Sequence, residues 1–228
     1  MTLAIAMFGI DGLVLGTDSR VTGGEVGRAD TSEKFLQVNR DTGVMTFGFA
    51  SPGYEGISRL VEDVKRRRVE LSRFSQIRDH AHGIFRETYG RFVSGQTVPA
   101  PEGSLGFILA GYDSVETNQF RIVSFMSPEF VPQEIIMPFF LTAQWHIAQY
   151  ILLKVYFPEA TVELLKDMAV FVIAETMSVH ADVGGPMQLA IVDRAGGFQR
   201  LAEREIGQII TKNQTRFSRW RQIVQEAL

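Results

Sequence analysis

The order in which hydrophobic periodicity changes along the chain constrains the fold more than any other feature of the sequence. Residues 2–8 and 13–17 are apolar runs joined by a turn that contains Asp11 and Gly12, and "KFLQV" and "VMTFGFA" form a second pair around "NRDTG". Short apolar runs separated by polar, glycine-containing turns are typical of β-hairpins. The first 50 residues are therefore predicted to form four antiparallel strands.

After residue 50, the spacing of apolar residues changes from every second residue, as in a strand, to a period of 3.6 residues, as in a helix. Apolar residues recur on one face over 57–64 and on another over 74–92, which predicts two helices. Strands resume in "LGFILAGYD", "QFRIVSFM" and "EIIMPFF". Two helices follow over 143–155 and 161–179, interrupted at Pro158, and the hairpin "MQLAIVDRAGGFQRL" leads into a C-terminal amphipathic helix.

Strands, two helices, strands and two helices in this order indicate segregated layers rather than alternating strand–helix units. Two antiparallel sheets packed face to face, with helices on both outer sides, would bury all of these apolar faces. The sequence therefore predicts an α+β fold, a four-layer αββα sandwich. No linker interrupts the pattern, so we expect residues 1–228 to form a single domain.

Composition argues against several classes of function. The formal net charge of −3 disfavours a nucleic-acid binder, and the absence of cysteine excludes disulfides, thiolate metal sites and a cysteine nucleophile. The uncharged stretch 135–153 approaches the length of a membrane span, but Pro138 and several polar side chains interrupt it, so a buried strand and a buried helix are expected instead. We expect a cytoplasmic protein with no metal and no cofactor.

Thr2 stands directly behind Met1, at the head of the first predicted strand. If Met1 is removed, Thr2 carries both a hydroxyl nucleophile and an α-amine whose pKa in model compounds is roughly 7.7–8.0. At neutral pH part of that amine is unprotonated and can accept the hydroxyl proton, so no histidine is required.

Such a nucleophile needs a cation nearby and an acid to hold that cation. Asp18 ends the second predicted strand and Lys34 begins the third, so strand pairing would bring both beside the first strand, with Arg20 close behind. Gly48 in "FGFAS" offers a backbone N–H for an oxyanion. Each residue alone is ordinary in a strand or on a surface, and only their combination indicates an enzyme.

Together, Thr2, "GTDSRVT", the lysine of "EKFLQV" and "TFGFAS" resemble the proteasome β-type peptidases of the N-terminal nucleophile (Ntn) hydrolases, and their relative spacing is the family's through Gly48. The match is strongest over 2–65 and looser beyond. The resemblance implies the αββα Ntn hydrolase fold and a threonine-type peptide hydrolase in a self-compartmentalising homo-oligomeric ring. It also implies unfolded protein or peptide substrates, and allows an ATP-driven unfoldase as partner.

The resemblance assigns roles to individual residues. Thr2 would be nucleophile and base, Asp18 and Lys34 the supporting pair, Arg20 their neighbour, and Gly48 the oxyanion donor. Two groups would bind substrate: the backbones of Thr22 and Ala50 pair with it as an added strand, while the specificity pocket is shaped by Val21, Ser32, Thr46 and Ala50.

The sequence departs from the family in the second half of the site. The family has a serine before its third helix, where this chain has "LTAQWHIA", with Thr142 as the nearby hydroxyl. The family also has an aspartate and a serine near the end of its fourth helix. Asp182 supplies this aspartate if the alignment shifts, whereas an ungapped match places His180 and Val183 at the two positions. Two alternatives therefore stay open: a catalytically weak or silent ring-forming scaffold that binds peptides, and a narrow-substrate N-terminal threonine amidase or transpeptidase.

Overall fold

The computed structural model describes residues 2–23, 27–30, 32–96, 101–142 and 145–226. Within these residues the strands form two five-stranded antiparallel sheets and one short hairpin. The first sheet consists, in spatial order, of β10 (Phe139–Thr142), β1 (Ala4–Phe8), β2 (Gly12–Thr17), β11 (Gln188–Asp193) and β12 (Gly197–Arg200). The second consists of β5 (Phe35–Gln37), β6 (Thr42–Gly48), β7 (Leu105–Asp113), β8 (Gln119–Met126) and β9 (Gln133–Glu134). The hairpin pairs β3 (Val21–Gly23) with β4 (Gly27–Ala29).

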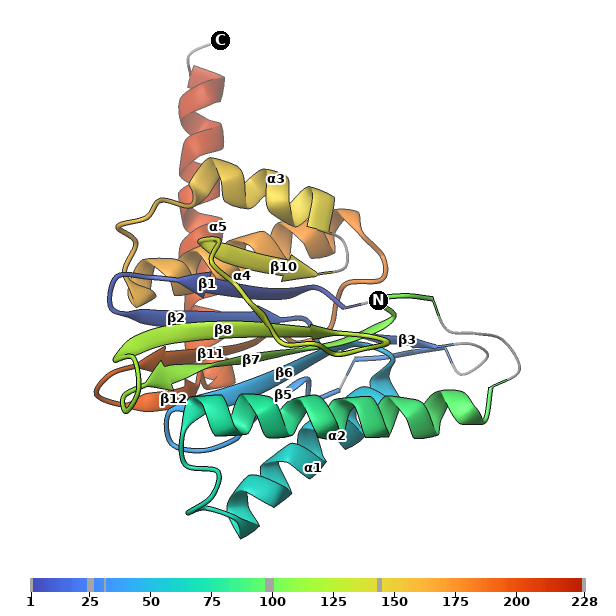
Figure 1. Cartoon of the computed structure of the whole chain (residues 1–228). Coiled ribbons are helices and arrows are strands. Elements are labelled where there is room, and N and C mark those ends of the chain that lie inside the picture. The colour runs from blue at the N-terminus through green and yellow to red at the C-terminus, as the bar shows by residue number, and fades with distance from the viewer. Residues whose placement is uncertain (1, 24–26, 31, 97–100, 143–144, 227–228) are drawn as a thin grey trace.

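Helices cover the outer face of each sheet, as Figure 1 shows. The second sheet carries α1 (Ala50–Arg66) and α2 (Phe74–Ser94), and the first carries α3 (Trp145–Val155), α4 (Val162–Val179) and α5 (Glu203–Glu226). The four-layer αββα sandwich predicted from the sequence is confirmed. No helix in the described part of the chain has the length and apolar character needed to cross a bilayer.

Strand β1 is buried on both faces, and its residues alternate between two apolar layers. Ile5 and Met7, like the preceding Leu3, pack against the helices of the first sheet, while Ala4 and Ala6 face the second sheet. A shift of one residue in the pairing of β1 would exchange these two sets. The register of β1 against β2 and β10 is therefore strongly specified, and it fixes where Thr2 and Leu3, the two residues before the strand, lie.

The structure differs from the sequence predictions in two places. Six strands, rather than four, occur within the described residues up to position 50, because β3 and β4 form an additional hairpin. The segment "EIIMPFF" is not one strand, since β9 joins the second sheet and β10 the first, with Pro138 between them. Pro138 has no N–H to donate to a ladder, which suits a crossing point between sheets.

Helix α3 is only partly buried, although the sequence predicted a buried helix. Ala148 and Leu152 are fully buried on its inner face, whereas Tyr150 and Leu153 are each 66% exposed. The prediction was wrong on this point because an uncharged sequence does not show which apolar side chains a neighbouring layer covers.

Candidate active site

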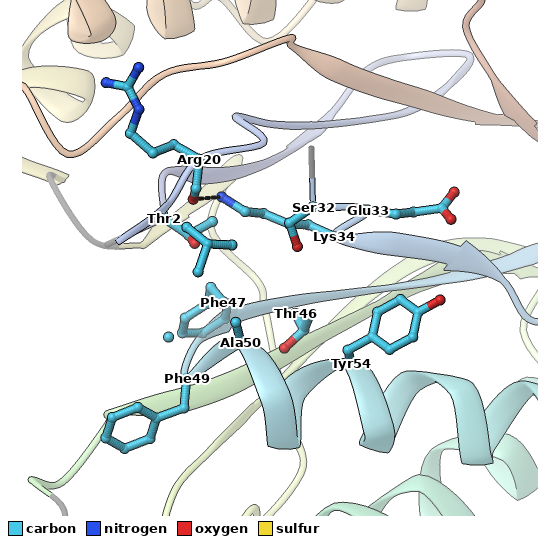
Figure 2. A pocket seen from close by; sticks show the side chains of 12 residues that line it. Thr2, Arg20, Ser32, Glu33, Lys34, Thr46, Phe47, Phe49, Ala50 and Tyr54 are labelled. Carbon is cyan, nitrogen blue, oxygen red and sulfur yellow. Dashed lines mark hydrogen bonds between the residues drawn. The ribbon is translucent and has the colours of Figure 1, made fainter. Parts of the chain in front are cut away.

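Thr2 lies at one end of a cavity of about 190 Å³ that opens between the two sheets (Figure 2). The segment 32–34 forms one wall, the last residues of β6 form the floor, and the first turns of α1 form the opposite wall. Thr2 itself is only 5% exposed. The cavity thus places the hydroxyl-bearing Thr2, two residues before β1, within reach of a bound molecule.

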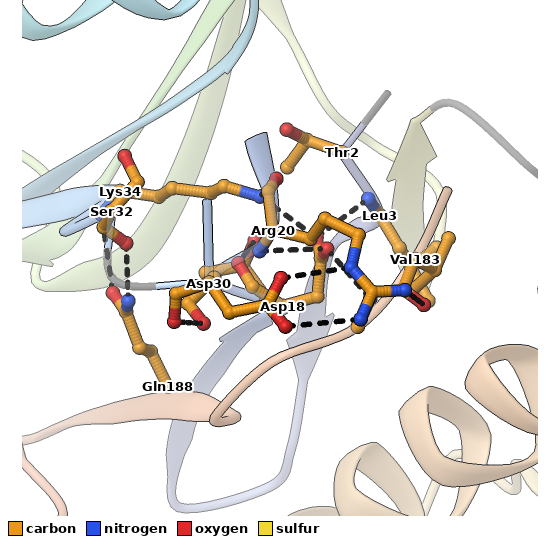
Figure 3. A network of polar contacts seen from close by, with 12 residues as sticks. Thr2, Leu3, Asp18, Arg20, Asp30, Ser32, Lys34, Val183 and Gln188 are labelled. Atoms are coloured by element: carbon orange, nitrogen blue, oxygen red, sulfur yellow. Dashed lines mark hydrogen bonds and ion pairs between the residues drawn. The ribbon is translucent and has the colours of Figure 1, made fainter. Parts of the chain in front are cut away.

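Asp18, immediately after β2, is fully buried and is the centre of a polar network beside Thr2 (Figure 3). One carboxylate oxygen accepts hydrogen bonds from Leu3 N (3.1 Å) and Lys34 Nζ (3.0 Å). The other accepts from Arg20 N (3.2 Å) and Gly184 N (3.1 Å). Because Asp18 binds the amide that follows Thr2 as well as the lysine, it fixes Thr2 and the Lys34 ammonium relative to each other.

The Lys34 ammonium is buried between the Asp18 carboxylate and the backbone carbonyl of Arg20, at 3.0 and 2.7 Å. Its side chain is 4% exposed. Burial lowers the pKa of Lys34 below that of a free lysine, and the neighbouring Asp18 charge opposes this effect. The arrangement supplies a desolvated cation that lines the same cavity as Thr2.

Arg20 is turned away from the cavity toward the loop after α4, as Figures 2 and 3 show. Its guanidinium binds both carboxylate oxygens of Asp30 (2.8 and 3.0 Å) and the carbonyl of Ala181 (2.8 Å). The hydrogen bond to Asp30 is the main cause that raises the pKa of Arg20. A Cβ at Gly184 would lie 2.4 Å from the guanidinium carbon, so a larger residue there would displace the Arg20 side chain. The structure therefore places Arg20 in the support of the site.

Asp182 lies in that loop and is half-buried. Its N–H donates to His180 Nδ1 (3.3 Å), and its charge contributes to raising the pKa of Arg20. Asp182 is not among the described residues that line the Thr2 cavity. The structure thus brings Asp182 beside Arg20 rather than beside Thr2.

Gly48, the last residue of β6, lines the cavity in a conformation that favours glycine. Its φ is +92°, and a Cβ there would lie 2.0 Å from the carbonyl oxygen of Ser104. Close backbone packing and left-handed geometry both require the absence of a side chain at this position.

The residues expected to bind substrate are mostly at the cavity. The described lining includes Val21, Ser32, Thr46 and Ala50. Thr22 lies in β3 opposite Arg28, and its side chain is outside the described part of the structure, as is Met1. Thr142, at the end of β10, directs its hydroxyl to the carbonyl of Thr2 at 3.5 Å.

Gln188, the first residue of β11, is a site residue that the sequence did not reveal. Its side-chain amide donates to the carbonyl of Ser32 (2.6 Å) and accepts from the N–H of Lys34 (3.1 Å). The Gln188 side chain thus gives residues 32–34, which form one wall of the cavity, one donated and one accepted hydrogen bond, as the backbone of a neighbouring strand would. No local sequence signal marks it, because its partners lie 154 and 156 residues away.

Within the described residues, no group of three or more histidine, aspartate or glutamate side chains is placed to hold a metal ion. The chemistry that the site offers is that of a hydroxyl, a buried ion pair and backbone N–H groups. These are the components of nucleophilic attack with oxyanion stabilisation.

Comparison with known proteins yields structural matches only. No protein-family model and no curated protein sequence matches the chain. Three solved structures that match over nearly their whole length are Anbu proteins. In the helical assembly of the Anbu complex from Pseudomonas aeruginosa, the subunit has a TM-score of 0.79 at 18% identity, covering 98% of this chain and 96% of its own. Anbu from Yersinia bercovieri, described as an ancestral beta-subunit, has a TM-score of 0.79 at 16% identity and coverages of 97% and 96%. Anbu from Hyphomicrobium sp. strain MC1 has a TM-score of 0.75 at 17% identity and coverages of 98% and 97%.

These matches show that the chain has the fold of Anbu proteins. They also correct the assignment to the proteasome β-type peptidases, which is wrong, because the structural neighbours belong to the distinct Anbu group. The short motifs over 2–65 that suggested the assignment serve the geometry of the N-terminal site, and they do not separate one group with this fold from another.

Proposed function

We propose that the chain is an N-terminal threonine hydrolase that cleaves amide bonds in peptides, with Thr2 as nucleophile once Met1 is removed. The observation that carries the proposal is the buried Asp18–Lys34 pair, which binds the backbone next to Thr2 and lines the same cavity. A buried ion pair is a costly structural feature, and a neutral pair of similar shape would often be more stable. Its position beside a hydroxyl therefore favours a role in chemistry.

In the first step, the unprotonated amine of Thr2 takes the proton of its own hydroxyl, directly or through a water, and the oxygen attacks the substrate carbonyl carbon. A C–O bond forms, and the carbonyl electron pair moves to the oxygen, where the N–H of Gly48 stabilises the charge. The Lys34 ammonium favours the threonine alkoxide and keeps the adjacent amine neutral.

The tetrahedral intermediate then collapses, and the C–N bond of the substrate breaks. The leaving amine takes the proton held by the Thr2 ammonium, and the acyl group remains on the threonine as an ester. A water molecule attacks this ester while giving a proton to the Thr2 amine. The C–O bond breaks, the carboxylic acid leaves, and the proton returns to the hydroxyl.

We also propose that the 228-residue chain is one domain that assembles with identical copies around enclosed sites, and that its substrates are peptides or unfolded proteins. The description of the Pseudomonas aeruginosa protein as a helical assembly supports association between copies of this fold. A cytoplasmic location is consistent with the cysteine-free sequence.

The test is the intact mass of the protein before and after reaction with a peptide epoxyketone, a reagent that bonds to both the hydroxyl and the free amine of an N-terminal threonine. We expect Met1 to be absent and one reagent to add. Labelling should disappear in Thr2→Ala and persist in Thr161→Ala, a matched change at the N-cap of α4 whose side chain makes no capping hydrogen bond. Retention of Met1 in the native protein, or labelling of the Thr2→Ala variant, would refute the proposal.

A second candidate is a catalytically weak or silent subunit that binds peptides. It is favoured by an ungapped alignment with the proteasome β-type peptidases, which places the buried Val183 where that family has a serine, and by Thr142, whose hydroxyl faces the carbonyl of Thr2. A sample that has lost Met1 and yet fails to react with the epoxyketone would support this candidate. If the protein reacts but refuses varied peptides while cutting one particular amide, a narrow threonine amidase would be supported instead.

A further inference from the structure

A second cavity, of about 530 Å³, lies at the far end of α1 from Thr2. The first turns of α1 line the Thr2 cavity through Ala50 and Tyr54, whereas the last turn lines the second cavity through Val64 and Lys65. The stretch of helix from Tyr54 to Val64 spans about 15 Å. Figure 1 shows α1 running away from the end of the sandwich at which the N-terminus lies. The second cavity is therefore separate from the Thr2 site.

The apolar side of the second cavity belongs to the core of the second sheet. Val38, Val64 and Leu71 line it and are buried. All three belong to the apolar cluster that packs α1 and α2 onto this sheet. Uncharged polar side chains complete part of the lining, namely Gln37, Asn39 and Ser72. The volume lies within the roughly 300–1,000 Å³ that is usual for sites binding a small molecule.

Two cations at the end of α1 line this cavity without a counterion. No hydrogen bond or ion pair joins the side chain of Lys65 or Arg68 to another residue in the described part of the chain. Arg66 and Arg67, which stand between them in the sequence, do not line the cavity, and each pairs with a glutamate of the same segment. The cations that face away from the cavity are thus paired, and the two that face it are not.

The helix dipole accounts for only part of this positive charge. The C-terminal end of a helix carries about −0.5 of an elementary charge, and basic side chains there compensate it. The last turn of α1 already contains Arg66, and neither Lys65 nor Arg68 binds a terminal carbonyl within the described structure. Asp41 is the one carboxylate among the described lining residues, and it faces Arg40, which also lines the cavity, at 3.9 Å. An excess of two positive charges therefore remains.

We propose that the second cavity binds a small organic phosphate, with the phosphate group between Lys65 and Arg68 and the apolar part against Val38, Val64 and Leu71. A phosphate monoester carries about 1.5–2 negative charges at neutral pH and three strong acceptor oxygens, so it matches two cationic donors. Its apolar part is stabilised by leaving water for the buried lining. This inference does not depend on the proposed hydrolase function.

The test is isothermal titration calorimetry of the whole protein with four probes: phenyl phosphate, inorganic phosphate, benzoate and benzyl alcohol. We expect phenyl phosphate to bind at one site per chain and about tenfold tighter than inorganic phosphate, because the ring adds buried apolar area. Benzoate, with a single charge, should bind more weakly than phenyl phosphate, and the neutral alcohol should not bind. Added KCl should weaken the binding of phenyl phosphate, since salt screens exposed charges.

The chain supplies its own matched controls. Lys65→Gln and Arg68→Gln should each weaken the binding of phenyl phosphate about fivefold, as for a partly exposed charge pair. Arg66→Gln and Arg67→Gln remove the same charge from the same segment and should change the binding less than about twofold. All four positions are exposed, so we expect the variants to fold. Because the site is remote from Thr2, epoxyketone labelling should stay unchanged in Lys65→Gln and Arg68→Gln.

Several outcomes would overturn the inference. Equal weakening by all four substitutions would show that only the general positive charge of this segment attracts phosphate. Inorganic phosphate that binds as tightly as phenyl phosphate would show that the apolar lining has no part in binding. Benzoate that binds as tightly would remove the preference for phosphate. The absence of binding of phenyl phosphate at millimolar concentration would refute the site altogether, and the four probes with the wild-type protein decide the matter if a variant does not fold.

Discussion

Replacing Asp18 by asparagine keeps the shape of the side chain and exchanges one carboxylate oxygen for an NH₂ group. Among substitutions near the site that preserve side-chain shape, we expect this one to destabilise the protein most. Asp18 accepts hydrogen bonds from Leu3 N and Lys34 Nζ on one oxygen and from Arg20 N and Gly184 N on the other. Asparagine keeps one oxygen and replaces the other by an NH₂ group, so whichever way it turns, two buried donors face another donor.

The expected loss follows from these contacts. A buried donor left without an acceptor costs about 1–3 kcal/mol. Removing one partner of a buried ion pair costs about 3–5 kcal/mol, because the remaining charge is uncompensated. We expect the free energy of unfolding of Asp18→Asn to fall by about 3–5 kcal/mol at neutral pH, a large part of the 5–15 kcal/mol typical of a folded protein.

The assay is urea denaturation at one fixed protein concentration, because association between subunits changes the apparent stability. Asp182→Asn is the matched control. Asp182 is half-buried, and no hydrogen bond to its carboxylate is seen among the described residues, so we expect a loss below about 1 kcal/mol. A loss below about 1 kcal/mol for Asp18→Asn itself would refute the reasoning.

A double-mutant cycle tests the coupling directly. Lys34→Met removes the buried ammonium and keeps a long apolar side chain. In the double variant with Asp18→Asn, no uncompensated charge remains, so the loss should be smaller than the sum of the two single losses by about 0.5–3 kcal/mol. Additive losses would show that the pair is not coupled as its 3.0 Å contact indicates.

Three further predictions concern the residues that support the site. Gln188→Leu removes the hydrogen bonds to Ser32 and Lys34, so the free energy of unfolding should fall by about 1–3 kcal/mol and epoxyketone labelling of Thr2 should slow. Unchanged labelling would contradict a role of Gln188 in positioning these residues. Because burial lowers the pKa of Lys34, the unfolded chain binds more protons between the folded pKa and that of a free lysine. The free energy of unfolding should therefore rise with pH between these two pKa values, while epoxyketone labelling of Thr2 should fall. Both effects should be absent in Lys34→Met. Urea denaturation and labelling, each measured over a series of pH values, will test this. Gly48→Ala places a Cβ against the Ser104 carbonyl at a residue with positive φ. This change should lower the free energy of unfolding by at least about 1–2 kcal/mol and abolish labelling. In the control Gly95→Ala no described atom lies within 4 Å of the added Cβ, so stability and labelling should be nearly unchanged.

Much of the fold could be predicted from the sequence, because the order in which strand-like and helix-like hydrophobic periodicity alternates along the chain specifies the layers. The strands β7 and β8 coincide with the predicted segments "LGFILAGYD" and "QFRIVSFM". The β3–β4 hairpin was missed because strands of three residues within a glycine-rich stretch are too short to show a period. The division of "EIIMPFF" between two sheets depends on which sheet edge each half meets, and that is a tertiary property.

The family assignment failed for a related reason. A threonine two residues before β1, an acid after β2, a lysine before β5 and a glycine at the end of β6 are all required to build a site of this geometry. Any protein that keeps the site keeps the spacing, so the spacing indicates the chemistry without identifying the group. The global comparison of structures uses nearly the whole chain, and it shows that the chain has the fold of Anbu proteins.

Within the site, the predictable residues are those whose partners are close in sequence. Asp18 and Lys34 are 16 residues apart, and they meet between the two sheets rather than by pairing of their strands, since Asp18 follows β2 of the first sheet and Lys34 precedes β5 of the second. Gln188 reaches the same place only because β11 pairs with β2 in a register that sets Gln188 opposite Thr17, the residue before Asp18. A slip of one residue in that pairing would turn Gln188 to the other face of the sheet and release the wall segment, while leaving every N-terminal residue of the site in the sequence. The geometry around Thr2 therefore depends on β11 as much as on the β1–β2 hairpin that Thr2 precedes.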